Sequence, residues 1–98
     1  MEIITAKPEI LKFIEKSEAK LGKVNLFILT TWEVINNILE LRLTVSNGRP
    51  TLSNSKNTII ATINTTEEEK KVLQRYARNL RFWLSRRFPD IKIETNLW

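Results

Sequence analysis

The chain has 98 residues and a net charge of +5, with 42% hydrophobic and 28% charged residues. This length and composition predict one globular domain over residues 1–98 and argue against disorder. The sequence contains no cysteine, no histidine and a single aspartate, Asp90. It therefore lacks the common zinc ligands, a thiolate nucleophile and the usual general base near neutral pH. No phosphate-binding loop or nucleophile motif is present, so we expect a non-enzymatic protein without a metal or cofactor.

The hydropathy pattern predicts no membrane contact. No apolar run approaches the roughly 20 residues that a membrane-spanning helix needs. The segment Met1–Pro8 lacks the basic and then apolar pattern of a secretory signal. We therefore expect a cytoplasmic protein.

In chain order, residues 2–6 are compatible with a first short strand. A helix then begins near Pro8, which suits a first helical turn, and ends at Gly22, a suitable C-terminal cap. The next segment, Lys23–Thr31, is apolar on both alternations. This pattern indicates an interior strand covered on both faces, or a strand whose second face meets a partner.

A tight turn is predicted at Asn36-Asn37, because asparagine tolerates positive φ. Ile38–Ser46 alternates between apolar and polar residues, which is typical of a strand with one exposed face. A second turn at Asn47–Pro50 leads into a polar loop over Thr51–Asn57, followed by a β-branched strand at Thr58–Asn64.

The polar loop region contains two cations, Arg49 and Lys56. They either add contacts to a partner or belong to a mobile connection, and we favour the connection because loops carry mobility as well as function.

A long helix is predicted from about Glu67 to Phe88. Thr65 or Thr66 caps it, three glutamates occupy its first turn, and Pro89 disfavours helical geometry in the residue before it. A last short strand follows at Asp90–Glu94. The short connections between residues 23 and 64 then predict a single α+β domain with the order β-α-β-β-β-α-β, in which two helices pack on one face of an antiparallel meander sheet.

This order resembles the β-α-β-β-β-α arrangement of ribosome hibernation factors, and its α-β-β-β-α part resembles double-stranded RNA-binding domains. The segment Ala77-Arg78-Asn79, with Asp90–Ile93 after it, is loosely similar to ribosome-binding factor A. That family has a KH-like fold and an Ala-x-Gly kink where this chain has Asn79. The lysines that mark the second helix of double-stranded RNA-binding domains are glutamates here. The resemblance is therefore one of topology and implies the fold alone.

The long helix carries the positive charge of the chain. Residues 70–88 have a local charge of +7 and contain no acid, so the remaining residues sum to −2. On a helical projection five residues fall on one stripe, which we call the basic stripe: Lys71, Arg75, Arg78, Phe82 and Arg86. The projection places Val72, Tyr76 and Trp83 on the opposite, core-facing side. Arginines at this spacing reach successive phosphates, and Phe82 is suited to stack on an unpaired base.

The basic stripe supports two interpretations besides an ordinary solvated surface. The preferred one is a nucleic-acid-binding face that contacts phosphates, with RNA favoured and structured RNA as one candidate partner. The alternative is a protein interface, either in a homodimer or against an acidic complex, with Trp32, Phe82 and Trp98 as apolar anchors and the arginines at the rim. Trp32 could equally be a core residue, and Trp98 could pack back on its own domain.

Overall fold

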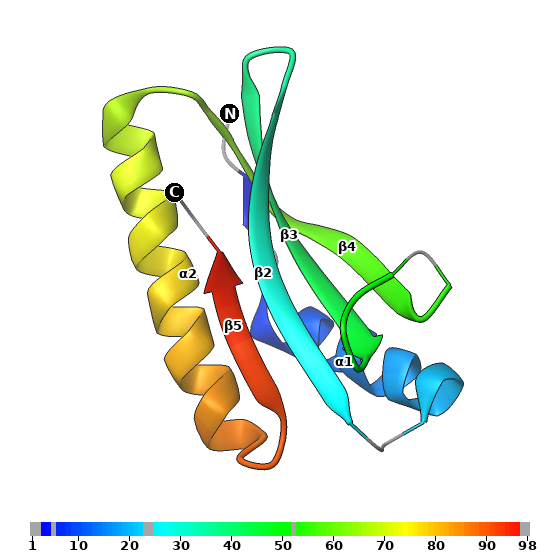
Figure 1. Ribbon diagram of the computed structural model, residues 1–98. Coiled ribbons are helices and arrows are strands. Elements are labelled where there is room, and N and C mark those ends of the chain that lie inside the picture. The colour runs from blue at the N-terminus through cyan, green and yellow to red at the C-terminus, as the bar shows by residue number, and fades with distance from the viewer. Residues whose placement is uncertain (1–2, 5, 23–24, 52, 97–98) are drawn as a thin grey trace.

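The computed structural model describes residues 3–4, 6–22, 25–51 and 53–96, and for Ile3 and Ile4 the backbone alone. The elements in chain order are β1 (Ile3–Ile4), α1 (Lys7–Leu21), β2 (Leu26–Ile35), β3 (Ile38–Asn47), β4 (Ser55–Asn64), α2 (Glu67–Arg87) and β5 (Lys92–Asn96). They form one α+β domain, as predicted (Figure 1). Its radius of gyration is 13.2 Å, close to the value of about 13 Å expected for a compact domain of this size.

The sheet is mixed, and this corrects the prediction of an antiparallel meander. Its strand order is β1-β4-β3-β2-β5. Strands β2, β3 and β4 do form an antiparallel meander, and β1 joins β4 in antiparallel register, but β5 lies parallel to β2. The direction follows from the chain path, because β4 runs in the same direction as β2 and α2 carries the chain back before β5 begins. A helical crossover of this length is the usual connection to a parallel strand.

Local sequence explains how the elements begin and end. Asn36 and Asn37, at φ 51° and 64°, form the two-residue turn between β2 and β3, where Ile35 pairs with Ile38. Thr66 caps α2 by accepting a hydrogen bond from the backbone N–H of Glu69 at 3.2 Å. These contacts place the hairpin turn and the start of the long helix where the sequence predicts them.

Two strands are longer than predicted. β2 continues to Ile35 rather than ending at Thr31, and β4 begins at Ser55 rather than Thr58. The added residues of both strands pair with β3. In β4, Ser55 lies opposite Ser46, and in β2, Glu33 lies opposite Glu40. The β3–β4 loop is correspondingly short. Asn54 orders it by donating from Nδ2 to the carbonyl oxygens of Asn47 and Arg49, at 2.7 and 2.9 Å.

The core lies between one face of the sheet and both helices. α1 packs against β3 and β4, and α2 packs against β4 and β5. In Figure 1, α1 passes behind β3 and β4, while α2 runs beside β5. One contiguous cluster joins these elements, and its largest fully buried side chains are Ile10, Ile14, Ile28, Leu39, Leu41, Leu43, Ile60, Ile63, Leu73, Leu80 and Leu84.

The other face of the sheet carries the alternate residues of each strand. On β3 these are polar, with Glu40, Arg42 and Thr44 half-buried. On β2 the outward residues near the start of the strand are Phe27 and Leu29, both half-buried and apolar. Among the described residues neither helix covers this face. The prediction that this strand is covered on both faces is therefore wrong, and a partner on its second face stays a prediction.

Candidate nucleic-acid interface

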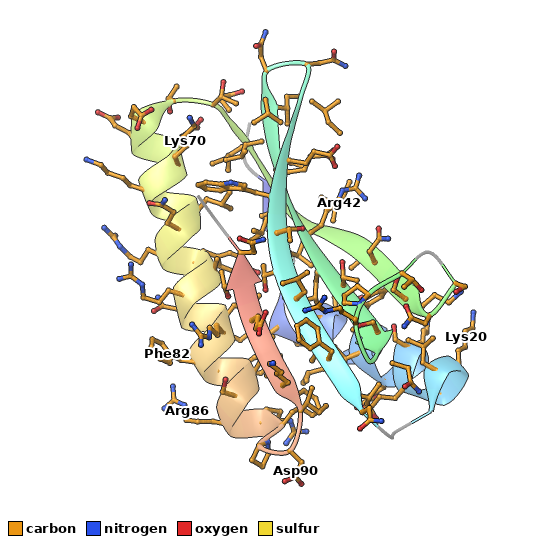
Figure 2. The ribbon with its side chains drawn as sticks, in the orientation of Figure 1. Lys20, Arg42, Lys70, Phe82, Arg86 and Asp90 are labelled. Carbon is orange, nitrogen blue, oxygen red and sulfur yellow. The ribbon has the colours of Figure 1, made fainter. Side chains whose placement is uncertain are left out.

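All five residues of the basic stripe lie exposed on α2. Figure 2 shows Phe82 and Arg86 projecting from α2 away from the sheet. Phe82 is 55% exposed, the largest exposed fraction among the large hydrophobic residues that the structure describes. The structure thus brings the sequence-predicted site residues together on one open surface of one helix.

The positive charge of α2 is almost entirely uncompensated. Lys70 pairs with Glu67 one turn earlier, with 3.7 Å between Nζ and Oε1. Within the described part of the chain, the other cations of α2 have no carboxylate within ion-pair distance: Lys71, Arg75, Arg78, Arg81, Arg86 and Arg87. The acidic first turn does not reach them, because the glutamates lie at the helix N-terminus, where the helix dipole favours them.

The buried side of α2 contains fewer residues than the helical projection predicted. The residues buried against the core are Leu73, Ala77, Leu80 and Leu84. Val72, which the sequence placed on the core-facing side, is 43% exposed, and that placement is wrong. It lies about 100° away from Leu73 around the helix, outside the arc of buried residues. Val72 therefore adds a second exposed apolar side chain to the outer surface of α2.

Trp32 is not available as an interface anchor. It is 7% exposed and belongs to the core cluster, because β2 extends through it and alternation places its ring on the buried face with Ile28 and Thr30. Trp98 lies outside the described residues. Trp83 is half-buried against the core, and Lys7 Nζ stands 5.1 Å from the centroid of its ring. Among the three proposed interface anchors, only Phe82 is described and exposed.

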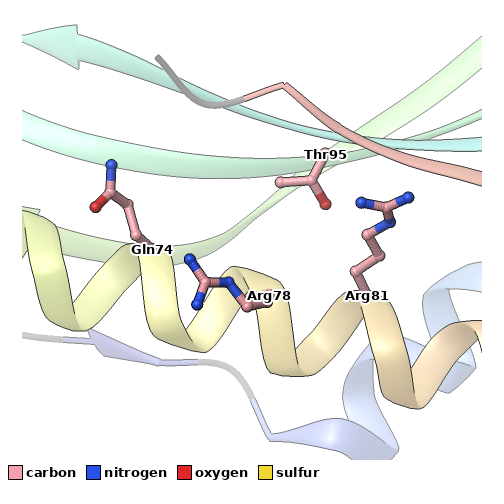
Figure 3. A pocket seen from close by; sticks show the side chains of 4 residues that line it. All are labelled: Gln74, Arg78, Arg81 and Thr95. Atoms are coloured by element: carbon pink, nitrogen blue, oxygen red, sulfur yellow. The ribbon is translucent and has the colours of Figure 1, made fainter.

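A cationic groove runs along the side of α2 that faces β5, and the sequence did not reveal it. The groove has a volume of about 260 Å³ and is lined by Gln74, Arg78, Arg81 and Thr95 (Figure 3). Arg81 also lines a larger open pocket that extends onto the outer face of the sheet. Sequence reasoning left Arg81 outside the basic stripe, because its position beside β5 depends on the parallel pairing of β5 with β2.

Burial raises the pKa of the Tyr76 hydroxyl above its ordinary value. No cluster of three or more acidic side chains suited to a metal ion occurs within the described ranges. The helices of the described residues include none that is long and apolar enough to cross a membrane.

Comparison of the chain with protein-family models, curated proteins and solved structures gives no match. The chain is therefore assigned to no family.

Proposed function

We propose that the chain is a small non-enzymatic protein that binds nucleic acid, with RNA favoured, through the basic stripe of α2. The observation that carries this proposal is the set of exposed cations on α2 with no ion-pair partner among the described residues. Positive charge that is concentrated on one face attracts a polyanion. It also destabilises the folded protein, because the like charges repel one another. A nucleic-acid backbone satisfies such a face because each phosphate neutralises one cation and releases condensed counterions.

The exposed ring of Phe82 supports RNA with unpaired bases as the preferred partner. It lies between Arg78 and Arg86 on the same stripe, so a base stacked on it belongs to a strand whose phosphates meet the arginines. Unpaired bases in RNA loops and single strands stack on aromatic side chains in this way, whereas a regular duplex offers no such base.

The test is fluorescence anisotropy with labelled single-stranded and hairpin RNA over a range of salt concentrations. The triple variant Arg75→Gln/Arg78→Gln/Arg86→Gln should bind weakly. Its slope of log affinity against log salt should fall by about 2 to 3, at roughly 0.7–0.9 per lost phosphate contact.

The matched control removes the same charge from α1. Lys12, Lys16 and Lys20 are exposed lysines on a different helix, and their triple replacement by glutamine also lowers the net charge by three. We expect this variant to keep most of the wild-type salt slope. Equal losses in the two triple variants, or no binding by the wild type at low salt, would contradict the proposal.

A homodimer is the second candidate, and the pattern of α2 favours one particular arrangement. Exposed residues recur at alternating spacings of four and three: Glu68, Val72, Arg75, Asn79, Phe82 and Arg86. If two copies of α2 pack antiparallel, one register places Glu68 opposite Arg86 of the second copy and Val72 opposite Phe82. That seam is self-complementary, as a two-fold interface must be. Light scattering tests it: a monomer at every concentration, unchanged by Phe82→Glu, would exclude the dimer.

A further inference from the structure

The apolar patch on the outer face of β2 is the floor of an open pocket. Phe27 and Leu29 form this floor, and Arg49 and Pro50 of the β3–β4 loop and Arg81 of α2 form part of its walls. Its volume of about 490 Å³ lies within the range of roughly 300–1,000 Å³ that holds small ligands. An apolar floor beside two arginines is suited to a flat ring that carries a negative charge.

The loop that carries Arg49 is held by hydrogen bonds. Asn54 Nδ2 donates to the Arg49 carbonyl oxygen at 2.9 Å, and the N–H of Gly48 donates to the Asn25 carbonyl oxygen at 2.7 Å. The backbone of Arg81 lies within α2, and its side chain is exposed. The two arginines therefore reach the pocket from two different elements, the β3–β4 loop and α2.

The charge of the pocket is positive although a carboxylate lies on its wall. Glu94 lines the pocket, but its Oε1 is 3.5 Å from Lys92 Nζ, so an adjacent lysine already balances it. Neither Arg49 nor Arg81 has an ion-pair partner in the described part of the chain. A phosphate in contact with either guanidinium group would form charge-assisted hydrogen bonds with it.

The face of the Phe27 ring already attracts a cation. Lys92 Nζ stands 5.7 Å from its centroid. The side chain of Lys92 is 70% exposed, so its displacement by a flat ligand costs little packing.

We propose that this pocket takes one unpaired nucleotide of a bound single strand, with its base against Phe27 and its phosphate between Arg49 and Arg81. The inference rests on the proposed function and extends it. Arg81 also lines the groove that contains Arg78 of the basic stripe (Figure 3). A strand whose phosphates follow the stripe therefore has a continuous cationic path around the edge of β5 to the outer face of the sheet. The stacked base supplies the preference for unpaired over duplex nucleic acid.

The test replaces the ring of Phe27 and varies the probe. Phe27→Leu keeps an apolar side chain but removes the flat ring, and Phe27→Tyr keeps the ring. Anisotropy is measured with a short single-stranded RNA, an abasic strand of the same length and a blunt duplex. Phe27→Leu should weaken binding of the RNA strand by roughly 5- to 150-fold, as expected for one lost stacking contact. Phe27→Tyr should restore that binding.

The abasic strand and the duplex should bind wild type and Phe27→Leu equally, with an unchanged salt slope. Adenosine monophosphate should compete only weakly, because it lacks the phosphates that the basic stripe binds. If the wild type binds the RNA strand and Phe27→Leu binds it equally well, the pocket assignment is wrong while the proposed function stands. If adenosine monophosphate competed as strongly as the RNA strand binds, the pocket assignment would also be wrong, because the pocket would then bind a free nucleotide. If the wild type binds no strand at low salt, the proposed function fails and this inference fails with it.

Discussion

Glu33 of β2 and Glu40 of β3 lie directly opposite each other, and Arg42 forms an ion pair with each carboxylate. Arg42 Nε lies 3.6 Å from Glu33 Oε2, and Arg42 Nη2 lies 3.2 Å from Glu40 Oε1. Like charges directly opposite each other in a sheet are destabilising, so the guanidinium group makes this pairing tolerable. Arg42 also donates from Nη1 to Asn57 Oδ1 at 3.1 Å, which links β3 to β4 on the outer face.

Replacing Arg42 by glutamine should therefore lower the free energy of unfolding by about 1 kcal/mol, a modest figure because these ion pairs are partly exposed. Urea denaturation measures the change. Glu33→Gln in the Arg42→Gln background should recover part of the loss, since it removes one of the two opposed charges. Additive losses in the double variant would show that the two carboxylates do not interact through Arg42.

Thr30 and Thr95 are neighbours in the parallel register of β2 and β5, and their hydroxyl oxygens are buried without a hydrogen-bond partner among the described residues. Thr30→Val removes one unsatisfied hydroxyl at nearly constant volume, so it should raise the free energy of unfolding by up to about 1 kcal/mol. Thr44→Val, on the outer face of β3, is the matched control and should change stability little. Destabilisation by Thr30→Val in a thermal or urea melt would mean that its hydroxyl has a partner, such as a buried water.

Local signals in the sequence were sufficient to place the hairpin turn and α2. Asn36-Asn37 tolerates the positive φ of the turn, and Thr66 and Pro89 flank the long helix. The exposure of the basic stripe also followed from helical periodicity alone. These features depend on contacts between residues close together in the chain.

The features that the sequence did not reveal depend on pairing between distant segments. Trp32 is in the core because β2 extends to Ile35 along β3, which a turn signal alone does not determine. The register shift at Leu41/Arg42 leaves Ile60 as an extra residue in β4, so that Ile60 and Ala61 are both buried. The pocket on the outer face needs both the Arg49 loop and β5 beside β2. For that reason, the apolar residues on both alternations of Lys23–Thr31 predicted a second apolar surface on this strand. They did not predict which residues of the other elements complete the pocket.

Tyr76 should make stability fall more steeply at high pH. Because burial raises its pKa in the folded state, the unfolded chain loses the phenolic proton first as pH rises. The stabilisation is complete below the ordinary pKa of about 10 and is lost as pH rises through the folded value. Urea unfolding from neutral to alkaline pH should show a smaller loss above about pH 10 for Tyr76→Phe than for wild type. Parallel curves for the two proteins would contradict this expectation.

Disulfide trapping should distinguish the antiparallel dimer from a monomer that binds nucleic acid. The chain has no cysteine, so the introduced thiols are the only ones in each variant. In the dimer register, Val72 of each copy lies opposite Phe82 of the other, and Val72→Cys/Phe82→Cys should oxidise to a covalent dimer visible on a non-reducing gel.

The single variants Val72→Cys and Phe82→Cys are the matched controls. Ten residues separate the two positions, so in that register each single cysteine lies about 15 Å along the helix axis from its own copy. This exceeds the Cα separation of roughly 7 Å beyond which a disulfide does not form. Trapping by the double variant alone, suppressed by added RNA, would show that self-association and nucleic-acid binding use the same stripe. Equal trapping by the single variants would reflect random collision. If none of the three variants formed a covalent dimer, this dimer would be excluded and α2 would be free to bind nucleic acid.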